Sequence, residues 1–208
     1  MSVRIFRNFL AILIFIANLS ALRAQKTHEI KLLIVDGFSN HDWQRTTQSI
    51  IHILNIYKGF KIDVSTSPDN SATKDQIESW SPDFSAYDVV MLSCNDKGTP
   101  VNWGDPTRRS LERFVTSGGG LYIFHSANNG FENWDEYNRM IGLGWRNKNF
   151  GKAAIVVDDG TIRVVNAGDG ENTAHGSRVN ALATRIGNHP IQKGLPKSWI
   201  YADIEVYT

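Results

Sequence analysis

Cysteine is nearly absent from this sequence. Cys94 is the only one in 208 residues, so no disulfide can form within the chain. It ends the apolar segment YDVVMLSCN, where we expect a buried small hydrophobe rather than a nucleophile. With 41% hydrophobic residues, the chain can form one domain with a core of its own.

An excess of charge of either sign is also missing. Lys and Arg number 22, Asp and Glu number 21, and the net charge is +1. No block of like charges marks a tail. Nucleic acid is therefore not an expected partner, because such partners need a basic surface.

No hydrophobic run is long enough to be a typical membrane span. The apolar run at 9–22 is short and contains polar residues. It follows Arg4 and Arg7, in the order typical of a secretory signal. We predict a signal peptide over 1–24 and a periplasmic or secreted chain over 25–208, without stable membrane association after cleavage. An uncleaved anchor is the alternative.

The rest of the chain alternates between strand and helix patterns. This alternation predicts βαβ units in a doubly wound, mainly parallel sheet of order 2-1-3-4. From about residue 150 the pattern changes to a hairpin and loops, and the end at Thr208 reads as an interrupted strand, which predicts a truncated domain. Strands are expected at 29–37, 60–68, 86–95 and 121–125, helices within 41–59, 105–120 and 131–142, and a hairpin over 152–165.

Polar residues follow three of these strands. Ligands in doubly wound folds bind beyond the carboxyl ends of the strands, so these residues should share one edge of the sheet. They are His41, Asp42 and Trp43 after the first strand, Asn95 after the third and His125 after the fourth.

Imidazoles can act as general bases, general acids or metal ligands. His41 and His125 are the candidates for function, and with His175 they could hold Zn²⁺, although no short His-x-x-His spacing supports a metal. A nucleophilic Ser126 is not favoured, because the G-x-S-x-G pattern is missing. A structural role for each histidine is the alternative.

Tryptophan is frequent, with 6 residues. Trp43, Trp103 and Trp134 fall near the predicted edge. The face of an indole ring can receive the C–H edge of a sugar, and packing inside loops is the alternative for each of them.

Three long segments, DGFSNHDWQRTT, FVTSGGGLYIFHSANNGFENWDEYNRMIGLGWR and HPIQKGLPKSW, resemble the ThuA-like (trehalose utilisation) family. The resemblance covers residues 31–207 and implies a flavodoxin-like fold, similar to class I glutamine amidotransferases. Those enzymes carry a Cys nucleophile at the corner after the fourth strand. Here the corner is His125-Ser126, so amidotransferase chemistry is not expected.

The resemblance also implies a role in the use of disaccharides through 3-keto-sugar intermediates, with a small sugar as the partner. Its pocket residues would be His41, Asp42, Trp43, His125 and the pair His175-Gly176, with His189 and Glu205 nearby. Some positions depart from the family pattern: Asn128 stands where a carboxylate is usual, and a second His is missing near Arg178. These losses favour a weakened or inactive member.

Two functions remain as hypotheses. In the first, the protein is an exported enzyme in which His125 is the acid/base, oriented by His41 or Asp42. In the second it is a sugar-binding module without catalysis. In both, Asn95 and Asn128 hydrogen-bond sugar hydroxyls, Trp43 and Trp134 offer ring faces, and His175 and Glu205 contribute to binding; the sugar and the oligomeric state are not predicted.

Overall fold

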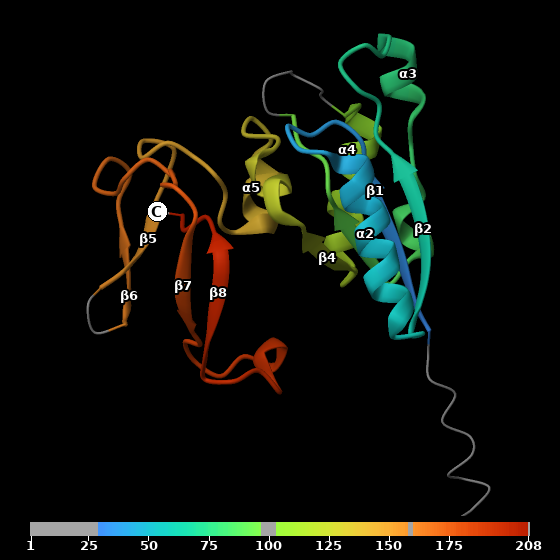
Figure 1. Ribbon diagram of the computed structural model, residues 1–208. Helices are drawn as coiled ribbons and strands as arrows, with labels where there is room; N and C mark the ends of the chain where they lie inside the picture. Colours follow the sequence, from blue (N-terminus) through green and yellow to red (C-terminus); the bar gives the residue numbers. More distant parts are fainter. Residues whose placement is uncertain (1–28, 97–102, 158–159, 208) are drawn as a thin grey trace, which may run out of the picture. The chain divides into compact units, whose positions relative to one another are not determined.

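A computed structural model describes residues 29–96, 103–157 and 160–207 (Figure 1). The predicted signal peptide over 1–24 lies outside them. The described residues cluster into two compact units that divide between Gly130 and Phe131. We call them the N-terminal unit and the C-terminal unit and describe each by itself; the prediction of one domain over 25–208 stays a prediction.

The N-terminal unit is built on a parallel sheet of order β2-β1-β3-β4. This order confirms the predicted doubly wound arrangement. The fourth strand is shorter than expected and ends two residues before His125. The strands are β1 (Ile30–Asp36), β2 (Phe60–Thr66), β3 (Val89–Leu92) and β4 (Gly120–Ile123).

The central strand β1 is buried on both faces of the sheet. Leu32 and Ile34 pack with Ile50 of α2 (Trp43–Ile56) and with Met91, so α2 covers one face, as Figure 1 shows. Leu33 and Val35, which alternate to the other face, are equally buried. This explains why β1 reads as a continuous apolar run.

The remaining helical segments of the N-terminal unit connect the strands. The helix α3 begins with a capping box between Thr73 and Gln76, and α4 has a proline in its first turn, where the missing N–H costs nothing. They are α3 (Lys74–Ser79), η1 (Phe84–Ala86), α4 (Asp105–Thr116) and the 3-10 turn η2 (His125–Asn129).

The glycine run 118–120, whose last residue begins β4, allows a close turn between α4 and the sheet. Gly118 has a φ of 93°, which favours glycine. A Cβ at Gly119 would lie 2.3 Å from the ring of Phe114, which is buried. The glycine run is therefore explained by packing.

The C-terminal unit contains two antiparallel hairpins. The pairs are β5 (Ala153–Val156) with β6 (Ile162–Val165), as predicted, and β7 (Val179–Thr184) with β8 (Ser198–Ile204). The predicted helix over 131–142 is shorter, because α5 spans Asp135–Ile141 and Phe131 has a φ of 54°, which a helix does not accept. A short 3-10 turn, η3 (Pro190–Gln192), precedes β8.

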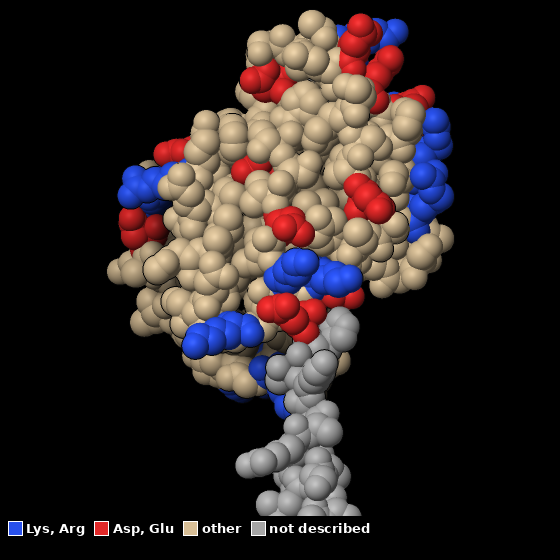
Figure 2. All heavy atoms as spheres, turned by 90° about the vertical axis from the view of Figure 1, so that its right-hand side faces the viewer, with Lys and Arg blue, Asp and Glu red and all other residues tan. Residues whose placement is uncertain are grey.

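Charged side chains of both signs are interspersed on the face shown in Figure 2, in keeping with the net charge of +1. Among the helices that the structure describes, none is both long enough and apolar enough to cross a membrane.

Candidate functional site

Two histidines lie side by side at the carboxyl edge of the parallel sheet. His41 belongs to the loop after β1 and His125 to the corner after β4. Their ring centroids are 4.7 Å apart, with the rings tilted by 56°. Both residues are exposed. The topology of the sheet thus brings two imidazoles from distant parts of the sequence to one accessible place.

The backbone of His125 is in an unusual conformation. Its φ is 44°, in the left-handed region that residues with a side chain seldom occupy. The next two residues, Ser126 and Ala127, are buried and anchor the corner in the N-terminal unit. Strained residues of this kind concentrate at functional sites, where the surrounding structure holds them in place.

Asp42 and Trp43 form the start of α2. The carboxylate of Asp42 accepts a hydrogen bond of 3.1 Å from the backbone N–H of Arg45, and its carbonyl accepts one from the hydroxyl of Thr46. Asp42 is therefore the N-cap of α2, a role that fixes the loop carrying His41. Orientation of an imidazole by this carboxylate stays a prediction, as does sugar binding by the half-buried Trp43.

Asn95 lies beneath the edge and not on it. Only 2% of the residue is exposed, and its Nδ2 donates to Asn40 Oδ1 at 2.9 Å and to the carbonyl of Ser126 at 3.2 Å. These contacts join loops to one another and leave a sugar contact untested. Asn128 is half-buried in the same 3-10 turn as His125.

The thiol of Cys94 is not a nucleophile in this fold. Burial is the main cause that raises its pKa to about 12, with a further contribution from the negative charge of Asp36. The thiol therefore stays protonated at neutral pH, as expected for a small core residue. The carboxylate of Asp36 is buried as well and accepts hydrogen bonds of 2.8 Å from Thr47 and Thr66.

Two of the three tryptophans considered as sugar platforms are buried. Trp103 donates its indole N–H to Ser67 at 2.8 Å and packs against Trp80. Trp134 packs against Phe131 and Tyr137 within the C-terminal unit. Burial of both rings favours the packing role.

The C-terminal unit holds a polar cluster around His175. Its Nδ1 lies 2.9 Å from the carbonyl of Gly176, and its Nε2 lies 3.8 Å from Glu205. A carbonyl oxygen can only accept, so a hydrogen bond here requires the tautomer with Nδ1–H, and the other ring nitrogen faces Glu205.

Three further residues complete this cluster, and sequence reasoning missed them. The hydroxyl of Tyr207 donates to Glu205 at 2.8 Å; burial raises the pKa of this phenol, and the hydrogen bond to Glu205 raises it further. Arg178 lies 3.7 Å from Glu205, and the ring of Trp145 contacts those of His175 and Tyr207. The available sign was the spacing Glu-x-Tyr directly after β8, where Tyr207 forms a β-bridge with His175.

Metal binding by His41, His125 and His175 stays a prediction. Among the described residues, no group of three or more His, Cys, Asp and Glu side chains is arranged as metal ligands would be. His175 belongs to the C-terminal unit, whereas His41 and His125 belong to the N-terminal unit. His189 is the N-cap of η3, where its ring Nδ1 accepts from the N–H of Ile191.

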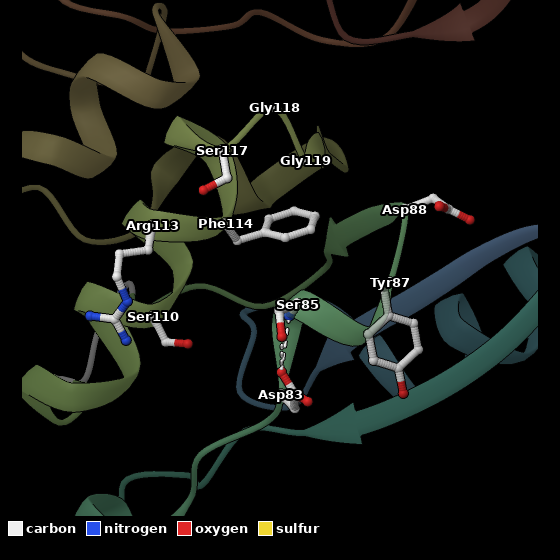
Figure 3. Close-up of a pocket in the computed structure, with 10 residues that line it drawn as sticks. All are labelled: Asp83, Ser85, Tyr87, Asp88, Ser110, Arg113, Phe114, Ser117, Gly118 and Gly119. Carbon is white, nitrogen blue, oxygen red and sulfur yellow. Dashed lines mark hydrogen bonds between the residues drawn. The ribbon is translucent and has the colours of Figure 1, made fainter.

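A hollow of the N-terminal unit lies at the opposite edge of the sheet from the histidine pair. A cavity of about 700 Å³ is found near the amino ends of β3 and β4 (Figure 3). Asp88 precedes β3 and Gly119 precedes β4, while Arg113 comes from α4. The predicted site is at the other edge, where doubly wound sheets carry their ligands and where His125 has its left-handed backbone.

Comparisons with known proteins agree with this description. The sheet order defines a flavodoxin-like α/β protein, and the histidine pair lies at the carboxyl edge of its sheet. The ThuA family, described as trehalose utilisation, matches residues 31–208, and the chain belongs to this family. No curated protein matches the chain.

A solved structure supports the same assignment. The crystal structure of a ThuA-like protein from Parabacteroides merdae ATCC 43184 is 33% identical, with a TM-score of 0.74. The match covers 86% of this chain and 62% of that one. The chain therefore spans less than two thirds of the length of this relative.

Proposed function

We propose that the protein acts on a sugar or an oxidised sugar by acid/base chemistry, with His125 as the central residue and His41 as its partner. The observation that supports this is the pair of exposed imidazole rings 4.7 Å apart at the carboxyl edge of the sheet. Membership of the trehalose utilisation family supports the choice of a sugar.

Two imidazoles suit a reaction on a 3-keto-glycoside. The carbonyl at C3 acidifies the proton at C2, which one neutral imidazole can remove. The electron pair of that C–H bond passes into an enolate, which then forms the C1–C2 double bond and expels the glycosidic oxygen from C1. The departing oxygen takes a proton from the other, protonated imidazole. No redox partner is required.

The test compares turnover of a 3-keto-disaccharide by the wild type and by H125A. We expect a loss of about 10²–10⁴-fold, the usual contribution of a general acid or base, and a smaller loss for H41A. The matched control is H52A, because His52 is an exposed histidine in α2. Equal turnover by H125A and H52A would refute the assignment.

The second candidate is a sugar-binding module without catalysis. It is favoured by Asn128, which lies next to the histidine corner and supplies an amide in place of a carboxylate. Calorimetry with the same disaccharide decides between the two: binding without product in the wild type supports the module. A parallel H175A variant shows whether the cluster of the C-terminal unit takes part.

Export is part of the proposal. It rests on the order of basic, apolar and small residues at the N-terminus. Fractionation of expressing cells, followed by mass determination of the mature chain, tests it. A full-length mass in the cytoplasm would contradict both export and cleavage after Ala24.

A further inference from the structure

Three loops meet at the carboxyl edge of the sheet, and the side chain of Asn95 joins them. Its Nδ2 donates to Asn40 Oδ1 at 2.9 Å and to the carbonyl of Ser126 at 3.2 Å, and it lies 3.5 Å from Ser39 Oγ. The donor comes from the loop after β3, and the acceptors belong to the loop after β1 and the corner after β4. These hydrogen bonds therefore link the loop of His41 to the corner of His125.

A hydroxyl pair continues this link to the histidines themselves. Ser39 Oγ and Ser126 Oγ are 3.3 Å apart, and Ser39 Oγ accepts a hydrogen bond of 3.2 Å from the backbone N–H of His41. Ser126 follows His125 directly. The backbone of His41 is thus hydrogen-bonded to one hydroxyl of this pair, and the residue that carries the other hydroxyl follows His125 directly.

The hydrogen bond between Asn95 and the carbonyl of Ser126 is shielded from water. Asn95 and Ser126 are both buried, and buried polar groups are costly to leave without partners. The far end of the corner also packs here, because a Cβ at Gly130 would lie 3.2 Å from Asn95 Cα. Asn95 lies beneath the edge of the sheet. This location suits a residue that holds loops in place rather than one that contacts a ligand.

We propose that Asn95 is a positioning residue that sets the distance between the rings of His41 and His125. Its consequence for turnover rests on the proposed function, whereas its effect on ring geometry does not. The substitution N95D isolates this role. An aspartate has almost the same shape, yet its carboxylate cannot donate and would face the oxygens of Asn40 and Ser126.

The experiment measures the nuclear Overhauser effect between the two rings in solution. With centroids 4.7 Å apart, the wild type should show it. We expect N95D to lose it, or to weaken it several-fold, at temperatures where the protein is still folded. If N95D does not fold, S39A serves instead, because it removes the shared hydroxyl and should weaken the effect in the same direction.

The matched control is T107V. Thr107 lies in α4, is fully buried and donates a hydrogen bond of 2.7 Å to the carbonyl of Trp80, so it belongs to neither of the loops that carry the histidines. It should lower the melting temperature without changing the ring–ring signal. A wild-type signal in N95D, or in S39A where N95D does not fold, would overturn the proposal.

Kinetics separate this proposal from the proposed function. If the sugar reaction occurs, N95D should lower kcat with little change in KM, because no sugar contact is lost. A raised KM with an intact ring–ring signal would make Asn95 a sugar ligand and overturn the positioning role. If the signal is lost in N95D while no variant and no wild type turns over sugar, positioning stands and the proposed function fails.

Discussion

The two units of the chain place their apolar residues differently. In the N-terminal unit, Ile34 and Val90 are fully buried in the sheet. In the C-terminal unit, Leu182 and Ile200 lie opposite each other in the β7–β8 hairpin and are 68% and 71% exposed. Both pairs stand on neighbouring strands, yet one is in a core and the other on a surface.

The difference follows from how the strands are connected. Parallel strands need a crossover that returns the chain to the same end of the sheet, and the helices in those crossovers cover its faces. A hairpin needs only a turn, so β7 and β8 pair locally without any helix between them. Strand pairing therefore forms regular β-structure in both units. In the N-terminal unit the crossover helices also bury the side chains on the faces of the sheet.

Truncation of a core residue should give the largest contrast between the units. I34A should lower the free energy of unfolding by about 2–5 kcal/mol, because it leaves a cavity in a packed core. L182A should change it by less than about 0.5 kcal/mol, because its side chain already meets water. Urea denaturation followed by circular dichroism measures both, and equal losses would contradict the contrast.

The core of the N-terminal unit should also make the stability of the protein depend on pH, through the buried thiol of Cys94. Burial raises the pKa of Cys94 from 9.0 to about 12, so the unfolded chain ionises first and stability falls as pH rises from about 9 toward 12. By about pH 10.5 the wild type should lose about 2 kcal/mol more than C94A. Parallel curves for the two proteins would show that the thiol is not buried in solution.

Replacing a glycine by alanine should lower the melting temperature where the added Cβ meets a neighbouring side chain and leave it unchanged where the surrounding space is open. G119A places a Cβ against the buried ring of Phe114, and we expect a cost of about 1–3 kcal/mol. Gly151 of the C-terminal unit has no such neighbour within 4 Å, so G151A should be neutral within about 0.5 kcal/mol. Melting temperatures of the two variants decide the matter.

The smallest effect is expected at the His175 cluster. Y207F removes the hydrogen bond to Glu205 from a partly exposed phenol, and the loss should be at most about 1 kcal/mol. The control is Y57F, because Tyr57 is an exposed phenol in the N-terminal unit. A loss well above that of Y57F would show that the cluster is more than a surface contact.

The order of the strands and the meeting of His41 with His125 could be anticipated from the sequence. Apolar runs, helical spacing and the handedness of βαβ units leave few alternatives for four strands, and polar residues after them must share an edge. The separation of the two rings could not be anticipated, because it depends on the left-handed backbone of His125 and on the hydrogen bonds beneath it.

Some contacts of the site residues were not anticipated, for reasons of the same kind. Asp42 caps α2, and its predicted part in catalysis stays a prediction. Tyr207 was not considered, because the residue type alone does not show that its hydroxyl donates to Glu205. A side chain's type and its position in the sequence do not reveal which hydrogen-bond partners it has.

The sequence alone determined the four strands of the parallel sheet, the helices α2, α4 and α5 and the β5–β6 hairpin, since these follow from local periodicity, caps and breakers. It did not indicate α3 or β7. The sequence also determined the class of fold, because four parallel strands can be connected by right-handed crossovers in only a few ways. Only the tertiary structure decided which polar side chains are buried and which meet solvent. Asn95 and His125 both follow sheet strands, yet one joins loops below the surface and the other is exposed, because burial depends on what neighbouring loops cover.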